Sequence, residues 1–252
     1  MTLFSANLGF LWADLPLPDA IRQAKNAGFD AVECHWPYAI DPLEVNAALT
    51  ETGLQMLGLN TPKGDGFGLT ALPEEAPARA AIDQAIAYAA AIDAKAVHVM
   101  AGIAAGREAK ASFINNLTYA ATKAMAHGIT ILIEPINNID VPGYFLTRTS
   151  QALAIISAVN LPNLKLMFDA YQVAMMEGDV RPHLDAAYDV IGHIQFAGVP
   201  HRGAPDEGDV DYAQLFAHLK SAGYTRPLGA EYKPDGGNTS ESLGWMKKLR
   251  MG

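Results

Sequence analysis

The sequence predicts an α/β fold, a single (β/α)₈ barrel that spans residues 1–252. Strand-like and helix-like segments alternate along the whole chain, and each pair takes roughly 30 residues, as a βα unit does. Eight such pairs occur without a linker or a break in composition. A doubly wound open sheet is the alternative. It is disfavoured because such sheets usually have about five to seven strands, and eight strand-like segments are counted here.

The first half of the chain supplies four predicted strands and four predicted helices. Glycines that terminate a helix stand at Gly28, Gly53 and Gly128. A Gly-rich loop covers residues 63–72, and a flexible surface position for its Lys63 is favoured over closure across a site. The strands are expected at 3–9, 29–36, 55–62 and 96–102, and the helices at 16–28, 42–53, 73–93 and 108–128.

The second half repeats this alternation. Its first strand is an apolar, Ile-rich run of the kind that a parallel strand covered on both faces requires. The strands are expected at 129–137, 164–171, 191–198 and 227–234, and the helices at 147–160, 180–189, 212–222 and 239–249.

Composition narrows the classes of partner. Half of the residues are hydrophobic and 18% are charged, which is typical of a globular protein with a substantial core. The net charge of −9 argues against a nucleic-acid partner, because a phosphate-binding surface needs clustered Lys and Arg. No run is apolar enough to span a bilayer. The single cysteine, Cys34, fits a reducing compartment, and the cytoplasm is the expected location.

Four predicted strands in the second half end in an oxygen-bearing side chain. These residues are Glu134, Asp169, Gln195 and Glu231. Burying an unpaired carboxylate costs several kcal/mol, so each one needs a cation, a proton or hydrogen-bond donors. A barrel that only had to be stable would place Val, Ile or Leu at most of these positions.

Alternation along the strands predicts which side chains face into the barrel. In the second strand Val32, Cys34 and Trp36 are expected to pack outward, which leaves Glu33 and His35 facing inward. The inward residues near the strand ends should then converge on the C-terminal mouth, where barrel active sites lie. This predicted set is Asn7, Glu33, His35, Asn60, Glu134, Asp169, Gln195 and Glu231.

The strand ends predict a metal site. Three carboxylates grouped without a cation would repel one another and raise one another's pKa values. One divalent metal removes that problem, and ligands that are all oxygens suit Mg²⁺ or Mn²⁺ better than Zn²⁺. The alternative is that each side chain is separately hydrogen-bonded to a rim loop.

Four motifs carry a family resemblance over nearly the whole chain. They are IEPINN at 133–138, MFDAYQ at 167–172, GHIQFAGVPHRGAPDEGDVDY at 192–212 and GAEYKP at 229–234. In order and spacing they resemble the hydroxypyruvate isomerases. Those enzymes are part of the xylose-isomerase-like TIM barrels, which also include ketose 3-epimerases and endonuclease IV. In that family the residues that match Glu134, Asp169, Gln195 and Glu231 bind the metal.

The resemblance implies an aldose–ketose type isomerisation through an ene-diolate, with hydroxypyruvate or a close analogue as substrate. The metal would chelate adjacent carbonyl and hydroxyl oxygens, and Glu134 and Glu231 would be the acid–base pair. Arg202 matches a substrate-binding arginine, which suits a small anionic substrate because a guanidinium can grip a carboxylate with two hydrogen bonds. His35, Asn60 and Gln172 are further candidates for substrate contacts.

Two departures keep other functions open. Family members commonly have His at the position of Gln172, and Arg-His-Glu-Pro where this chain has Arg202-Gly203-Ala204-Pro205. A ketose 3-epimerase, another sugar isomerase, or a metal-retaining binding protein with weak activity is therefore an alternative. An endonuclease is disfavoured by the acidic charge and by the shortage of strand-end histidines. Relatives are often dimers or tetramers, which leaves a homo-oligomer open.

Overall fold

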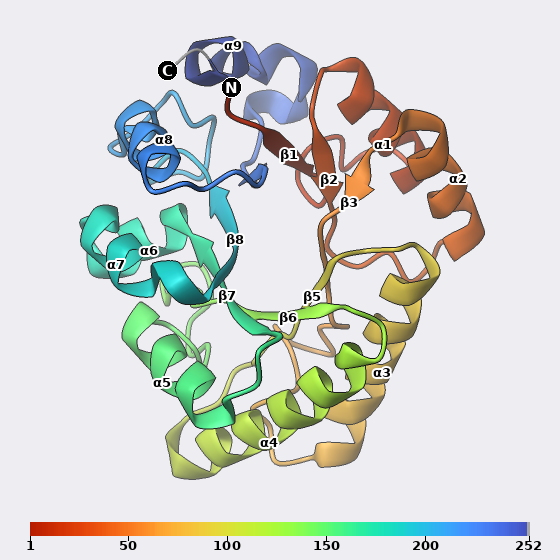
Figure 1. The fold of residues 1–252 in the computed structure, drawn as a ribbon, viewed down its shortest axis with the longest axis vertical. Coiled ribbons are helices and arrows are strands. Elements are labelled where there is room, and N and C mark those ends of the chain that lie inside the picture. The colour runs from red at the N-terminus through yellow and green to blue at the C-terminus, as the bar shows by residue number, and fades with distance from the viewer. Residues whose placement is uncertain (251–252) are drawn as a thin grey trace.

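The strands form one sheet in which all pairings are parallel, and the order is β3-β2-β1-β9-β8-β7-β6-β5-β4. The computed structural model describes residues 1–250. The strands are β1 (Phe4–Asn7), β2 (Ala31–Glu33), β3 (Gln55–Met56), β4 (Leu59–Asn60), β5 (Ala96–His98), β6 (Thr130–Ile133), β7 (Leu164–Asp169), β8 (Ile191–Phe196) and β9 (Leu228–Ala230). The predicted (β/α)₈ barrel is confirmed in a nearly closed form (Figure 1).

The third predicted strand is wrong in one respect, because two short strands, β3 and β4, replace it. The segment changes partner in the middle, pairing first with β2 and then with β5. At the change, Leu57 N donates to Val32 O at 2.7 Å while Lys95 N donates to Met56 O at 3.1 Å. This short segment therefore bonds to both neighbours and closes the barrel.

The helices surround the strands as a ring (Figure 1). They are α1 (Leu17–Asn26), α2 (Pro42–Thr52), α3 (Glu75–Ala91), α4 (Gly106–Met125), α5 (Thr149–Val159), α6 (Ala170–Glu177), α7 (Val180–Ala187), α8 (Tyr212–Ser221) and α9 (Gly244–Arg250). Among these, α6 was not predicted. It follows β7 without a loop, because Asp169 ends the strand and also caps the helix through Oδ1, which accepts from Tyr171 N at 2.9 Å. In residues 1–250, no helix has the length and apolar character needed to cross a membrane.

The main core lies between the sheet and the helices. Phe4 and Phe196, which face outward from β1 and β8, pack edge-on against Trp245 of α9, with ring centroids 5.0 and 5.5 Å apart. A separate apolar cluster of Ala96, Leu132 and Met167 forms a layer inside the barrel. These three residues precede His98, Glu134 and Asp169 by two positions, so the same barrel face changes from apolar to polar one layer nearer the mouth.

Most of the predicted facing directions agree with the structure. Asn7 and Glu33 are buried inside the barrel, as expected. Trp36 was predicted wrongly, because it does not pack outward on a helix. The chain leaves the ladder after Glu33, so strict alternation no longer applies, and the indole turns to the cavity at the mouth with 37% of the residue exposed.

Candidate active site

Three buried carboxylates meet at the C-terminal mouth of the barrel. Glu134 follows β6, Asp169 ends β7 and Glu231 follows β9, and one ligand atom from each lies within 4.8 Å of the other two. Gln195 of β8 is paired with Asp169 in the sheet register. The four residues predicted from the strand ends therefore come from four adjacent strands of one sheet.

Hydrogen-bond donors are distributed unequally over this cluster. Glu231 has three side-chain partners: Asn7 Nδ2 and His35 Nε2, each 2.9 Å from Oε1, and Arg202 Nη2, 2.5 Å from Oε2. In contrast, Glu134 Oε1 and Gln195 Oε1 are buried and have no hydrogen-bond partner in the part of the chain that the structure describes. Two oxygen acceptors are thus left free at the centre of the site.

The pKa values follow this asymmetry. Burial raises the pKa of Glu134 well above its usual range, and the negative charges of Glu231 and Asp169 raise it further. Burial also raises the pKa of Asp169, to about 7, although Arg202 acts against the rise. For Glu231 burial acts in the same direction, but Arg202 and His35 together lower its pKa to about 2. The cluster is therefore short of positive charge on the side of Glu134.

These residues fit a divalent cation. A buried group of carboxylates, together with two free acceptor oxygens, matches the all-oxygen ligand sets that hard cations prefer. The triad could hold a metal ion, with Gln195 as a fourth oxygen ligand.

A second layer of side chains orients Gln195. Its Nε2 donates to Glu33 Oε1 at 3.3 Å, and His193 Nε2 lies 2.5 Å from Glu33 Oε2. Because a carboxylate only accepts, it selects the amide nitrogen of Gln195 and leaves Oε1 free. Gly229 makes room for this contact, since a Cβ there would lie 2.4 Å from Glu33 Oε1. Glu33 therefore stands between His193 and Gln195 and contacts both.

The site opens into a cavity of about 420 Å³. Glu134 and Glu231 line it, whereas Asp169 and Gln195 do not. The four predicted substrate contacts, His35, Asn60, Gln172 and Arg202, all line it as well. Sequence reasoning did not assign other lining residues to the site: Phe10, Trp36, Lys63, Phe67, His98, Met100 and Lys233.

Two of the missed residues had a signal in the sequence. His98 and Met100 alternate with Val97 and Val99 in the fourth predicted strand, which predicts that they face inward, and both line the cavity. Burial lowers the pKa of His98 to about 3, so this ring is neutral near pH 7. In contrast, Lys63 and Phe67 lie in a loop, where no periodicity indicates direction; Lys63 is exposed, as expected, and it also lines the cavity.

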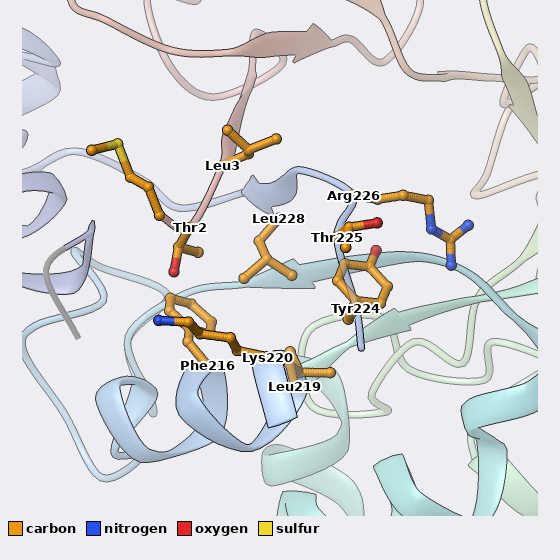
Figure 2. A pocket seen from close by; sticks show the side chains of 10 residues that line it. Thr2, Leu3, Phe216, Leu219, Lys220, Tyr224, Thr225, Arg226 and Leu228 are labelled. Atoms are coloured by element: carbon orange, nitrogen blue, oxygen red, sulfur yellow. The ribbon is translucent and has the colours of Figure 1, made fainter. Parts of the chain in front are cut away.

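Figure 2 shows the side chains that line a second cavity, of about 270 Å³. Leu3, Thr225 and Leu228 line it, and they stand at the N-terminal ends of β1 and β9. It contains none of the predicted site residues, and the active sites of barrels of this kind lie at the other face.

Comparison with known proteins agrees with this geometry. A family model described as "Xylose isomerase-like TIM barrel" matches residues 21–249. The chain belongs to this xylose isomerase-like TIM barrel family. It is 41% identical to the 2-oxo-tetronate isomerase of Cupriavidus necator, with 98% of each chain covered. It is 36% identical to the hydroxypyruvate isomerase of Escherichia coli K12, with 99% of this chain and 100% of that one covered.

A solved structure is also similar over its full length. That protein is described as an AP endonuclease, family 2, from Brucella melitensis, and the match has a TM-score of 0.94 and 36% identity over 98% of this chain and 99% of that one. Sequence identities of 41% and 36% over nearly the full length, to two enzymes named as isomerases, identify this member of the family as an isomerase.

Arg202 occupies the position that the family resemblance implied, but its guanidinium is already engaged. Nη2 lies 2.5 Å from Glu231 Oε2 and 3.4 Å from Asp169 Oδ2, while Nη1 lies 4.0 Å from Asp140 Oδ2. The group is stacked between the rings of Phe10 and Tyr171, 5.1 and 4.9 Å from their centroids. The backbone φ of Arg202 is +56°, a conformation that is costly for a residue with a Cβ and is typical of functional sites.

The departures from the family pattern have different structural consequences. Gln172 Oε1 accepts from Asn137 N at 2.9 Å and from Asn137 Nδ2 at 2.6 Å, so its carbonyl is fixed and its amide nitrogen is available to the cavity. At Gly203 a Cβ would meet no atom within 4 Å. Packing therefore does not exclude a side chain at residue 203.

Proposed function

We propose that this protein interconverts small 2-oxo hydroxy acids and the isomers in which the carbonyl has moved to the next carbon, with hydroxypyruvate and tartronate semialdehyde, or a close analogue such as 2-oxo-tetronate and its 3-oxo isomer, as the pair. The reaction moves a proton between adjacent carbons through an ene-diolate. The observation that carries the proposal is the placement of Glu134 and Glu231 on the wall of one cavity, from strands on opposite sides of the β7–β8 pair.

The two glutamates serve as the acid–base pair. Both are buried at the cavity wall, so water does not compete for their protons, and each has an oxygen that faces the cluster. One removes a proton from the substrate carbon, and the other returns a proton to the neighbouring carbon. Their different surroundings support this division: three donors hold Glu231, whereas Glu134 Oε1 has no partner in residues 1–250.

Four oxygens would hold a divalent metal, Mg²⁺ or Mn²⁺, at this site: those of Glu134, Asp169, Gln195 and Glu231. When bound, such an ion supplies Lewis-acid polarisation of the substrate oxygens next to the reacting carbons.

The remaining residues bind and orient the substrate. Arg202 has one guanidinium nitrogen, Nη1, that is not within hydrogen-bond distance of a carboxylate, and this group is placed to donate to a substrate oxygen. Gln172 presents its amide nitrogen, and His35 and Asn60 complete the polar wall. These donors suit a substrate that carries an oxygen on each carbon.

A ketose 3-epimerase or another sugar isomerase is the second candidate. The cavity volume of about 420 Å³ favours it, because that volume exceeds what a three-carbon acid fills. A binding protein with weak turnover is the third candidate, since Gln172 and Ala204 replace residues that commonly flank the family site.

Proton exchange separates these functions. The purified protein, loaded with Mg²⁺ or Mn²⁺, is incubated in D₂O with hydroxypyruvate, 2-oxo-tetronate or a ketose, and deuterium at carbon is followed by NMR. Exchange and isomerisation of an oxo acid support the proposal. Exchange with ketoses alone identifies a sugar isomerase, and binding without exchange identifies a binding protein. Either of the last two results contradicts the proposal.

A further inference from the structure

We infer that Lys63 is a specificity-determining residue that binds the carboxylate of the substrate. The inference rests on the proposed function, because it assumes that an oxo acid enters the cavity beside Glu134 and Glu231. Lys63 lines this cavity from the segment that follows β4. The site would then select acids over uncharged ketoses of the same length.

The backbone around Lys63 is held in place by β5 and by the residues after it. Thr61 N donates to His98 O at 2.9 Å, and Thr61 Oγ1 accepts from Met100 N at 3.1 Å. At the other end of the loop, Gly68 N donates to Lys63 O at 2.9 Å. Gly68 has a φ of +118°, and a Cβ there would lie 2.3 Å from Met100 O. The loop is therefore a closed turn anchored at both ends.

An indole ring positions the ammonium group without neutralising it. Lys63 Nζ lies 4.9 Å from the ring centroid of Trp36, and Trp36 Nε1 donates to Thr61 O at 3.1 Å. A cation–π contact of this kind orients an ammonium but leaves its charge available. Within residues 1–250, no carboxylate oxygen lies within 4.0 Å of this ammonium.

The other two cations of the cavity lie in less suitable surroundings. The Arg202 guanidinium and the Lys233 ammonium share the Phe10 ring, at 5.1 and 5.6 Å from its centroid. At that end Arg202 is paired with Glu231 and Asp169, whose negative charges oppose an incoming carboxylate.

Lys63 stands at the opposite end of a row of rings. Phe10 and His35 have centroids 5.1 Å apart, and His35 and Trp36 have centroids 5.2 Å apart. This row separates Lys63 from the carboxylates that hold Arg202. A substrate acid that lies along this row of rings can place its reacting carbons near Glu134 and Glu231 and its carboxylate against the ammonium of Lys63.

The test compares Lys63→Met with Lys63→Arg, with Lys233→Met at the other end of the cavity, and with Lys110→Met, an exposed lysine of α4. D-glycerate, an unreactive acid, is titrated into metal-loaded protein, and tryptophan fluorescence reports binding. Trp36 suits this purpose because it is 37% exposed, whereas Trp12 and Trp245 are 7% and 0% exposed. KM and kcat for hydroxypyruvate and for the uncharged dihydroxyacetone are measured in parallel.

We expect Lys63→Met to weaken D-glycerate binding and to raise KM for hydroxypyruvate about tenfold, the effect of a charge-assisted hydrogen bond. The kcat of Lys63→Met for hydroxypyruvate should stay within about twofold, and its KM and kcat for dihydroxyacetone should be unchanged. Lys63→Arg should bind D-glycerate as the wild type does, because arginine keeps the positive charge. Lys110→Met should match the wild type in all measurements. Unchanged D-glycerate binding in Lys63→Met, or an equal loss in Lys233→Met, overturns the inference. Binding of D-glycerate that depends on Lys63, without turnover of any acid, contradicts the proposed function alone.

Discussion

The two halves of the barrel contribute different chemistry to one cavity. In the half from β6 to β9, the strand ends carry Glu134, Asp169, Gln195 and Glu231, and β7 and β8 are each 6 residues long. In the half from β1 to β5, the corresponding ends carry Asn7, Glu33, His35, Asn60 and His98, where Glu33 is bonded to Gln195 and His193, and β3 and β4 are only 2 residues long. The carboxylates of the metal site therefore follow the continuous ladder β6-β7-β8-β9, and amide and imidazole side chains stand across the mouth from them.

This difference teaches how the site is held together. Grouped carboxylates repel one another, so they need positions that cannot relax apart, and the ladder from β6 through β7 and β8 to β9 supplies them. Neutral amides and imidazoles exert no such force, and short strands followed by loops are sufficient to place them. Reaction chemistry should therefore depend on the second half, and substrate selection on the first.

The largest expected effect is in the second half, at the acid–base pair. Glu134→Gln and Glu231→Gln should each lower kcat about 1000-fold or more, because an amide cannot exchange a proton with carbon. Glu108→Gln, an exposed glutamate in the first turn of α4, is the control and should leave kcat unchanged. Turnover is measured with the metal-loaded variants, after circular dichroism has shown that they are folded. Retained turnover in either site variant would remove that glutamate from the mechanism.

The second prediction concerns the stability cost of the carboxylate cluster. In the metal-free protein the pKa of Asp169 is raised to about 7, with burial as the largest cause. Because the folded state holds this proton more tightly than the unfolded state, the contribution of Asp169 to stability is full below about pH 4 and is lost as the pH rises to about 7. The Asp169→Asn variant carries no ionisable group at this position, so it does not lose this stability as the pH rises.

The free energy of unfolding of Asp169→Asn, relative to the wild type, should therefore increase between about pH 4 and pH 7, by at most about 4 kcal/mol. Urea unfolding with a chelator present measures it at each pH. Comparing the two proteins cancels titrating groups that the charge of Asp169 does not shift, such as His98, whose depressed pKa gives stability above about pH 6.5 that is lost as the pH falls toward 3. A difference that stays constant with pH would show that Asp169 titrates normally.

The third prediction tests the contact between the halves, where Glu33 of β2 orients Gln195 of β8. Gly229→Ala would place a Cβ 2.4 Å from Glu33 Oε1 and 2.9 Å from Gln195 Cγ, so both side chains must shift. We expect about a tenfold loss of Mn²⁺ affinity by calorimetry and a loss of about 1–3 kcal/mol in stability. Gly203→Ala is the matched control, since a Cβ there meets no atom within 4 Å. Equal effects of both substitutions would contradict the proposed role of Glu33.

The same division explains how far the sequence could be interpreted. The carboxylate half was predictable, because an ionisable residue at the end of an apolar strand is unusual on burial grounds alone, and Glu134, Asp169 and Glu231 do meet. The first half was less predictable. Trp36 and Lys63 reach the cavity from beyond the strand ladder, where alternation no longer specifies direction. Helix α6 was missed because Asp169 serves both as the end of a strand and as a helix cap.

The smallest expected effect belongs to the first half. Asn60 lines the cavity, and its Oδ1 lies 3.2 Å from His98 Nδ1. Asn60→Ala removes one neutral hydrogen-bonding group from the substrate wall, a change of about 0.5–1.5 kcal/mol, so KM should rise between about twofold and tenfold while kcat stays within about twofold. Asn115→Ala on the outside of α4 is the control.

Steady-state kinetics of Asn60→Ala show whether the first half of the barrel only binds the substrate or also takes part in the reaction. A change confined to KM means that Asn60 contributes equally to the bound substrate and to the transition state, as a selecting residue does. A fall in kcat as large as that of Glu231→Gln would mean instead that Asn60 and its neighbour His98 act on the reacting atoms. In that case the neutral half would take part in proton transfer, because His98 Nδ1 also lies 3.6 Å from Glu134 Oε2 and would connect the two halves at the acid–base pair itself.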